Sequence, residues 1–227
     1  VAPKYNEARE RTGWRLCVDF RRLNELTQAE QYPMPLMDEC LDRASATNSY
    51  ISIFDCASFF LQFALGDERT KSLTTTLFGR VGLARFTRMP FGLRSAPATA
   101  QRALDIIFDA AQCVGFIDDV ALAHRAATLD AAVDELIECV AVRAKLFGVA
   151  LNVDKMQLLK QSANFLGCTV HVGGKYEPPA GRMSALTDLP RPATVAGLRR
   201  FCQSAQHYSQ YIPGFSILAA PLWAVCG

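Results

Sequence analysis

Residues 115–123 of the chain read Gly-Phe-Ile-Asp-Asp-Val-Ala-Leu-Ala. Two adjacent carboxylates, Asp118 and Asp119, lie between two apolar runs that are each long enough for a short strand. This pattern predicts a tight hairpin with the two acids in its turn. Carboxylates held between buried strands repel each other and lose hydration, so they favour a bound cation. Oxygen ligands suit a divalent metal ion.

A third carboxylate is available upstream. Residues 50–54 read as a strand that ends on Asp55. An antiparallel sheet would bring this strand end close to Asp118 and Asp119. Three acids there can hold two divalent ions about 3.5–4 Å apart, the geometry used for in-line phosphoryl displacement. Aspartate at a strand end is also a common structural cap, and the spacing alone leaves that alternative open.

The composition indicates a globular protein. Half of the 227 residues are hydrophobic and 20% are charged, which is enough for one sizeable core or one domain with an appended piece. No apolar run is long enough to span a bilayer, and the N-terminus lacks a signal-peptide layout, so we expect an intracellular protein without a membrane contact. The chain begins at Val1 and stops shortly after Trp223, which suggests a fragment of a longer protein.

Cysteine spacing and charge limit the alternatives. The eight cysteines form no Cys-x-x-Cys pair and the three histidines have no metal-ligand spacing, so we expect reduced thiols and no zinc site. The net charge of +2 neither demands nor excludes a nucleic-acid partner. Arginines cluster on both sides of the first aspartate, which favours a phosphate-binding track, although solvated loop surface explains any single one of them.

Hydrophobic periodicity predicts a mixture of helices and strands. We expect strands at residues 14–20, 50–54, 74–77, 82–88, 156–159 and 164–172. We expect helices at residues 36–44, 95–111 and 129–146, with Gly148 ending the third, and a further helical region from Thr194. Prolines at 178–192 mark a linker, and the composition shift at 173–193 is the expected boundary.

Seven motifs occur in the order found in the reverse transcriptases of LTR retroelements, and the chain resembles the gypsy type. The motifs are residues 14–24 (WRLCVDFRRLN), 32–35 (YPMP), 54–55 (FD), 89–101 (MPFGLRSAPATAQ), 116–119 (FIDD), 151–155 (LNVDK) and 165–167 (FLG). Short motifs within residues 198–222 are similar to the connection segment that follows the polymerase. The resemblance covers nearly the whole chain, and seven motifs in the family's order are specific.

The resemblance implies an α+β, fingers–palm polymerase fold with an antiparallel palm sheet, followed by a helical connection segment. Residues 1–50 would belong to the fingers. Residues 51–175 would form the palm, with fingers strands inserted around 66–90. Residues 176–227 would form the exit from the primer grip and the start of the connection segment.

The resemblance also implies a reaction, in which a primer 3′-hydroxyl attacks the α-phosphate of a deoxynucleotide and pyrophosphate leaves. Asp55 and Asp118 match the main metal ligands, and Asp119 supports them. The cofactor would be two Mg²⁺ ions, with Mn²⁺ as a substitute. Lys155 matches a lysine proposed to protonate the leaving pyrophosphate; a solvated loop lysine is the alternative.

Further residues match nucleotide- and nucleic-acid-binding positions of the family. Arg15 would pack on the nucleotide and donate to its phosphates, as a planar guanidinium can. The other nucleotide-binding matches are Lys4, Phe60, placed beneath the sugar where it selects deoxynucleotides, and Gln101. The template and primer matches are Arg21, Asn24, Phe165, Leu166 and Gly167, the last three in the hairpin that grips the primer. Plain alternatives remain: an exposed strand arginine for Arg15, core packing for Phe60, and a core strand for Phe165.

Four departures from the family pattern point to a diverged copy with impaired activity. Phe116 stands where the family has tyrosine, Phe59 where it has glycine, and Ala100 where it has phenylalanine. The segment from Gln101 to Asp118 is about three residues shorter than the gypsy pattern. Phe59 adds bulk near the nucleotide pocket, and Ala100 removes core volume.

Three functions therefore stay open at this point. The first is an RNA-directed DNA polymerase, a nucleotidyltransferase that uses deoxynucleoside triphosphates and an RNA or DNA template with a primer. The second is a degenerate polymerase domain that binds nucleic acid without chemistry. The third is a structural module, such as the scaffold subunit of a dimer. The family implies RNase H and integrase domains in the same polyprotein, a homodimer as one assembly, and a cytoplasmic particle or the nucleus as the location.

Overall fold

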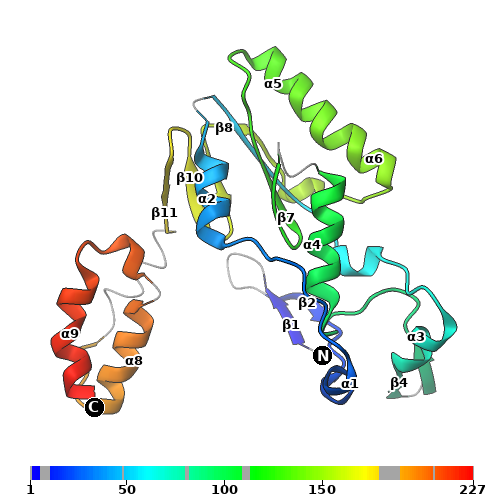
Figure 1. The fold of residues 1–227 in the computed structure, drawn as a ribbon, viewed down its shortest axis with the longest axis horizontal. Coiled ribbons are helices and arrows are strands. Elements are labelled where there is room, and N and C mark those ends of the chain that lie inside the picture. Colours follow the sequence, from blue (N-terminus) through cyan, green and yellow to red (C-terminus); the bar gives the residue numbers. More distant parts are fainter. Residues whose placement is uncertain are drawn as a thin grey trace.

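A four-stranded antiparallel sheet with strand order β6-β7-β3-β8 lies at the centre of the protein (Figure 1). The computed structural model describes residues 2–5, 11–47, 49–79, 82–108, 113–178, 190–206 and 208–226. The strands are β3 (Ile51–Asp55), β6 (Cys113–Phe116), β7 (Asp119–Ala123) and β8 (Gln157–Lys160). The predicted α+β fold with an antiparallel sheet is confirmed.

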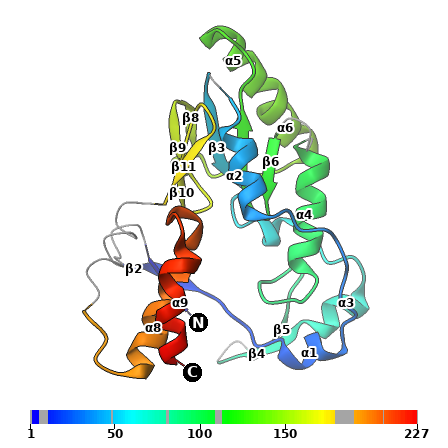
Figure 2. The ribbon, with the colours of Figure 1, turned by 60° about the vertical axis from the view of Figure 1, so that its left-hand side comes forward.

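Both faces of this sheet are covered (Figures 1 and 2). One face packs against α4 (Ala96–Ile107) and against a long helix formed by α5 (Leu129–Leu136), the π-helical η3 (Ile137–Val142) and α6 (Arg143–Phe147). The other face packs against α2 (Met37–Ser45) and a three-stranded sheet. That sheet consists of β9 (Ser162–Phe165), β10 (Cys168–His171) and β11 (Lys175–Glu177).

Strand alternation divides the core into two clusters. Phe54 and Val120 pack on the α4 side, whereas Ile51, Ile53 and Ala121 pack on the α2 side. Because successive side chains of a strand point to opposite faces, a strand that is covered on both sides is mainly apolar. This explains the apolar character of β3 and β7, each with an aspartate at one end. The exception is Ser52 of β3, which is buried and whose Oγ lies 2.8 Å from the His124 Nε2.

The N-terminal part contains small elements. β1 (Ala2–Tyr5) pairs with β2 (Arg11–Arg15), and α1 (Arg21–Leu26) follows. The predicted strand at 14–20 is wrong beyond Arg15, since residues 16–20 form no regular element. Asp19 ends this segment by accepting from the backbone N–H of Arg21 and pairing with its guanidinium. No residue of α1 is buried, so the helix has no amphipathic pattern to reveal it.

A second hairpin lies between the sheet strands in the sequence. α3 (Glu68–Leu73) begins at the N-cap Asp67, whose side chain accepts from Thr70. β4 (Thr75–Phe78) and β5 (Gly82–Arg85) follow as a two-stranded sheet. The short 3₁₀ helix η1 (Phe59–Gln62) lies just after β3.

The predicted helices at 36–44 and 129–146 are confirmed as α2 and the α5–α6 helix. Gly148, at φ 67°, ends the latter, because glycine adopts the left-handed conformation without a steric penalty. α4 begins as predicted and ends at Ile107; residues 109–111 of the expected helix lie outside the described residues. The predicted strand at 164–172 is instead the β9–β10 hairpin, with its turn at Leu166 and Gly167.

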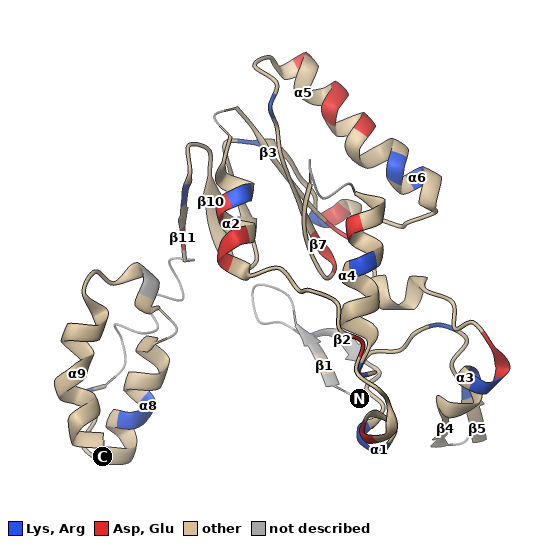
Figure 3. Cartoon of the chain, in the orientation of Figure 1, with Lys and Arg blue, Asp and Glu red and all other residues tan. Residues whose placement is uncertain are grey.

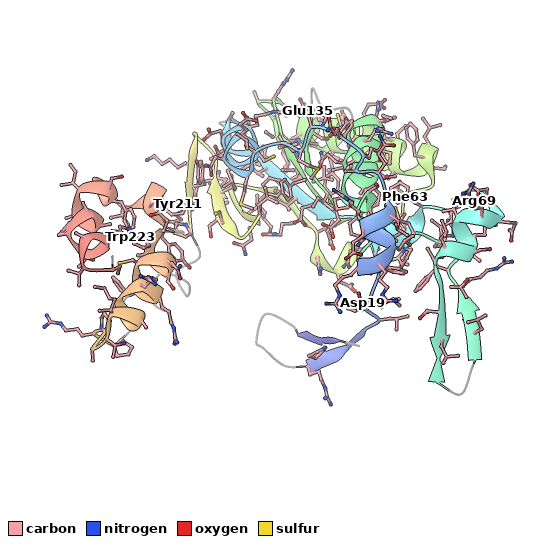
Figure 4. All side chains as sticks on the ribbon, turned by 60° about the horizontal axis from the view of Figure 1, so that its bottom comes forward. Asp19, Phe63, Arg69, Glu135, Tyr211 and Trp223 are labelled. Carbon is pink, nitrogen blue, oxygen red and sulfur yellow. The ribbon has the colours of Figure 1, made fainter. Side chains whose placement is uncertain are left out.

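The C-terminal part is a helical hairpin of α8 (Val195–Gln206) and α9 (Phe215–Cys226), joined through η5 (Ser209–Tyr211) (Figure 1). Tyr211 lies where this hairpin meets the β9–β11 sheet (Figure 4). Its hydroxyl is 3.1 Å from the Cys168 Sγ, and its ring packs edge-on against Tyr176. The boundary predicted at 173–193 falls largely on residues 179–189, which lie outside the described part.

The cysteine prediction is confirmed, since all eight cysteines are free thiols and only Cys17 among them is exposed. Within the described ranges, no helix combines the length and apolar character that a membrane crossing requires.

Candidate active site

Asp55 and Asp119 face each other across the two central strands. Asp55 ends β3, Asp119 begins β7, and the two are direct partners in the antiparallel register. The Cys56 N–H donates to the Asp118 carbonyl at 2.8 Å, which ties the β6–β7 turn to the chain after β3. The sheet thus brings the three predicted acids to one edge, at the acidic end of β7 (Figure 3).

The turn that carries these acids differs by one residue from the prediction. Phe116 pairs with Asp119, so Ile117 and Asp118 form the turn and Asp119 already belongs to β7. Ile117 has φ 61°, a left-handed conformation that is unfavourable for a β-branched residue and costs about 1–3 kcal/mol. Such a conformation persists only where neighbouring contacts hold it.

Gln101 supplies one of these contacts. Its Oε1 accepts from the Ile117 N–H at 2.8 Å, and its Nε2 donates to the Gly115 carbonyl at 3.0 Å. The side chain is only 1% exposed. The structure therefore turns the Gln101 amide toward the hairpin backbone, and the predicted nucleotide contact would need a rearrangement of these bonds.

Helix α4 can approach the hairpin this closely because residue 115 is glycine. A Cβ on Gly115 would lie 2.2 Å from the Leu104 Cδ2, well inside van der Waals contact. Leu104 is buried and has little room to move. Gly115 therefore lets α4 lie close enough to the hairpin backbone for the Gln101 side chain to reach it.

Burial and repulsion shape the protonation of the site. Burial first, and then the charges of Asp118 and Asp55, raise the pKa of Asp119 to about 6, while Lys155 opposes the shift. Burial also raises the pKa of the neighbouring Cys56 thiol to about 12. Cys56 therefore stays a neutral, inert side chain.

Lys155 pairs with Asp55. Its Nζ lies 3.1 Å from the Asp55 Oδ2, and the lysine side chain is 65% exposed whereas the Asp55 side chain is 16% exposed. η4 (Val153–Lys155) places this lysine, and the Asn152 N–H donates to the Asp55 carbonyl. A predicted catalytic lysine thus lies directly beside a predicted metal ligand.

The donor chemistry of this edge fits a divalent cation. The Asp55 Oδ1 is buried and, among the described residues, is the only buried side-chain oxygen or nitrogen without a hydrogen-bond partner. Carboxylate oxygens are the ligands that Mg²⁺ prefers. The described residues nevertheless contain no group of three His, Cys, Asp or Glu side chains arranged to hold a metal ion. Metal binding by all three aspartates therefore stays a prediction that requires the side chains to close around the ion.

A cavity of about 370 Å³ opens beside Asp55 and Asp118. Lys155 and Asn152 line it on the sheet side, and Phe91 lies on the loop side. The remaining lining residues are Leu16, Cys56, Ala57, Ser58, Phe59, Leu61, Phe86 and Pro90. The carboxylates thus meet a space that is bounded by one cation and by several apolar side chains.

Phe60 lies behind this cavity. Its ring packs edge-on against Phe91, with 5.3 Å between the ring centroids, and it is partly buried against the α4-side core. Phe59, Phe86 and Phe91 line the cavity and Phe60 does not, so selection of the sugar by Phe60 stays a prediction. Sequence reasoning missed Phe91 and Asn152 as lining residues, although both lie inside quoted motifs.

The structure describes the other predicted contacts to different extents. Lys4 and Arg15 lie on β1 and β2, but their side chains are outside the described part. Arg21 is exposed and forms a 2.6 Å ion pair with Asp19. The Asn24 amide donates to the Gly92 carbonyl and accepts from the Arg94 N–H, so it fastens α1 to the loop before α4.

The predicted primer-gripping residues form the β9–β10 turn. Leu166 and Gly167 both have positive φ, at 49° and 76°, and Gly167 is exposed. Phe165 is buried on the α2 side of the sheet and is only 2% exposed. Gly167 is therefore the exposed member of this motif, whereas Leu166 packs partly against the α2-side core and Phe165 supports the turn from within it.

Asp119 gives a testable pH dependence. In metal-free buffer we expect its contribution to the free energy of unfolding to fall as the pH rises from 3.8 to about 6. The folded state keeps the Asp119 proton to a higher pH than the unfolded chain, so folding takes up a proton in this window. Buried His124 has a lowered pKa and an opposite slope below 6.5. Urea unfolding of wild type and Asp119→Asn between pH 4 and 7 isolates the Asp119 slope; identical slopes would contradict it.

Carboxylates gathered on neighbouring antiparallel strands, beside a cavity with an aromatic lining, agree with the palm of a template-directed polymerase that the motif resemblance implies. The comparison with known proteins narrows this class. The chain belongs to the reverse transcriptase (RNA-dependent DNA polymerase) family, whose model matches residues 2–170.

Two curated relatives come from Drosophila melanogaster. The chain is 32% identical over 226 residues to the retrovirus-related Pol polyprotein from transposon 297. The alignment covers 98% of the chain and 21% of the relative. The chain is 28% identical over 212 residues to the corresponding polyprotein from transposon gypsy. This alignment covers 92% of the chain and 20% of the relative. The chain thus spans about a fifth of the length of these relatives, and the predicted gypsy-type resemblance is confirmed.

Solved structures show the same fold. The foamy viral protease-reverse transcriptase in complex with dsDNA superposes with a TM-score of 0.81 at 17% identity, over 98% of this chain and 44% of that one. Proteins of the reverse transcriptase family generally use divalent metal ions, which agrees with the buried, unpartnered oxygen of Asp55.

Proposed function

We propose that the chain is the RNA-directed DNA polymerase part of an element polyprotein and adds deoxynucleotides to a primer 3′-end on an RNA or DNA template. The register that sets Asp55 opposite Asp119, with Asp118 in the adjoining turn, carries this proposal. Asp55 and Asp118 line the cavity in which a nucleotide and a primer end could meet, and Asp119 lies beside them in the register.

Asp55, Asp118 and Asp119 would hold two Mg²⁺ ions, which Mn²⁺ could replace. Such ions, when bound, supply Lewis-acid stabilisation of the phosphoryl group and activation of the attacking hydroxyl. Lys155 is held beside Asp55 as a cation and can give a proton to leaving pyrophosphate. The apolar wall that includes Phe91 limits water in the cavity and strengthens these electrostatic interactions.

The larger assembly is part of the same proposal. Residues 1–50 would act as fingers, 51–175 as palm and 176–227 as the start of the connection, with RNase H and integrase elsewhere in the polyprotein. Both curated relatives are Pol polyproteins of which the chain covers about a fifth. The foamy viral neighbour bound to dsDNA supports a primer–template duplex as the partner. An intracellular element particle would be the location.

The proposal is tested by primer extension with a labelled DNA primer on an RNA template. With Mg²⁺ and deoxynucleoside triphosphates we expect stepwise extension, and we expect little with ribonucleoside triphosphates. Salt-dependent duplex binding without any extension would instead identify a degenerate, binding-only domain. Neither binding nor extension would indicate a structural module.

A further inference from the structure

A chain of hydrogen bonds runs from the connector before α2 to the carboxylate hairpin. The Tyr32 hydroxyl donates to the Asp105 Oδ2 at 2.7 Å. The other carboxylate oxygen, Oδ1, accepts from the Gln101 Nε2 at 2.9 Å. Gln101 in turn accepts from the Ile117 N–H and donates to the Gly115 carbonyl. Four side-chain and backbone links therefore connect a segment far upstream in the sequence to the residue before Asp118.

The chemistry of these partners fixes the direction of the Gln101 amide. The Gly115 carbonyl and the two Asp105 carboxyl oxygens accept in these bonds, and the Ile117 N–H only donates. The amide therefore has to turn its NH₂ toward Gly115 and Asp105 and its oxygen toward Ile117. With the side chain 1% exposed, water is a poor replacement for a lost partner.

The connector end of the chain is itself clamped. The Arg102 guanidinium lies over the Tyr32 ring, 5.3 Å from its centroid, and pairs with Glu30. The hydrogen bond to Asp105 raises the pKa of the Tyr32 hydroxyl, which therefore stays a donor at neutral pH. Two residues of α4 thus hold Tyr32, Arg102 at the face of its ring and Asp105 at its hydroxyl.

We propose that Asp105 and Tyr32 are positioning residues of the active site, which act through Gln101 to hold the left-handed turn at Ile117 and hence the directions of Asp118 and Asp119. The inference rests on the proposed function and deepens it. It assigns a role in the reaction to a residue of the connector and to one on the outer turn of α4, neither of which touches the cavity.

Two isosteric variants and one matched control test the proposal. Tyr32→Phe removes the first hydrogen bond, and Asp105→Asn leaves one acceptor oxygen for two donors. Thr99→Val is the control, because Thr99 also joins the connector to α4, by donating to Glu30, but forms no hydrogen bond with Tyr32, Asp105 or Gln101. All three variants lose a partly buried side-chain contact between the same two segments, so a purely structural effect would be similar in each.

Single-nucleotide incorporation gives the first measurement. We expect Tyr32→Phe and Asp105→Asn to lower kcat about tenfold, the size of one lost hydrogen bond, with the KM for the nucleotide within about twofold. Thr99→Val should keep the wild-type kcat. If all three variants shift the melting temperature alike and Thr99→Val has the same kcat as the other two, the positioning role is overturned.

A second measurement does not depend on activity. In protein with ¹³C-labelled isoleucine methyl groups, Ile117→Val identifies the Ile117 signal. We expect this signal to move or broaden in Tyr32→Phe and Asp105→Asn and to stay in place in Thr99→Val. If the Ile117 signal moves in these two variants while the wild-type protein extends no primer, the positioning role is supported and the proposed function is contradicted. An Ile117 signal that stays in place in both Tyr32→Phe and Asp105→Asn would overturn the positioning role, whatever the activity of the protein.

Discussion

Asp118→Asn is expected to lower the rate of single-nucleotide incorporation about a thousandfold or more while leaving the fold intact. A metal ion contributes several kcal/mol of transition-state stabilisation, and each 1.36 kcal/mol is a factor of ten in rate. Asp118 lies in an exposed turn and lines the cavity, so an asparagine of the same size should fit there without repacking. Quenched-flow primer extension at saturating nucleotide measures the change.

Asp134→Asn provides the matched control for this prediction. Asp134 is an exposed aspartate on α5, and its substitution removes the same charge far from the cavity. We expect wild-type incorporation from Asp134→Asn and an unchanged melting temperature for both variants. Incorporation by Asp118→Asn at the wild-type rate would remove Asp118 from the catalytic machinery.

Phe59→Ala is expected to lower the free energy of unfolding by about 3–5 kcal/mol, the usual result of truncating a buried phenylalanine. Phe59 is 2% exposed, packs edge-on against Phe63, and belongs to the same core cluster as Ala100. The family pattern has a small residue at position 59 and a large one at position 100, and this chain has the reverse. We infer that the Phe59 ring fills volume left by Ala100, so that the two departures compensate.

A double-mutant cycle tests this compensation. Ala100→Phe alone should overpack the core and lower the free energy of unfolding by about 1–3 kcal/mol. Phe59→Ala combined with Ala100→Phe should be more stable than the sum of the two single effects predicts. Phe108→Ala, combined with Ala100→Phe, is the control cycle. Phe108 is buried in the same cluster but lies eight residues after Ala100, about 12 Å away by helix rise. We expect the effects of this control pair to be additive. Additive effects for Phe59 and Ala100, measured by urea unfolding, would contradict the compensation.

Compensation between Phe59 and Ala100 would also change what these two departures imply about activity. From the sequence, Phe59 reads as an obstruction of the nucleotide pocket. In the structure it follows Ser58, which takes the left-handed conformation at φ 48°, and its ring is buried in the core although it borders the cavity. If the double-mutant cycle shows the predicted coupling, Phe59 and Ala100 give no reason to expect an inactive site.

Much of the fold could be predicted because strong local patterns agree with the packing. The apolar runs before Asp55 and after Asp119 became β3 and β7, since both strands are covered on two faces. The apolar periodicity of the α5–α6 helix and the glycine at 148 placed that helix and its end. α1 could not be predicted, because a helix without buried residues leaves no periodic signal.

The geometry of the site was less accessible to sequence reasoning. Two adjacent acids suggested a turn at 118–119, whereas strand pairing with Asp55 draws Asp119 into β7 and moves the turn to Ile117. A β-branched residue in a left-handed conformation contradicts local preference, and only tertiary contacts such as the Gln101 bond explain it. Neither the pairing of Asp55 with Asp119 nor the hydrogen bond from Ile117 to Gln101 leaves a signature in the spacing of residues.

Mn²⁺ binding tests the central claim, that Asp55, Asp118 and Asp119 hold the catalytic divalent ions. Electron paramagnetic resonance distinguishes free from bound Mn²⁺ as the ion is titrated into the chain with its primer–template duplex. We predict binding to the wild type that Mg²⁺ displaces, retention in Asp134→Asn, and loss in Asp55→Asn and Asp118→Asn. Equal Mn²⁺ binding by the wild type, Asp55→Asn and Asp118→Asn would contradict the assignment of the metal site to these carboxylates.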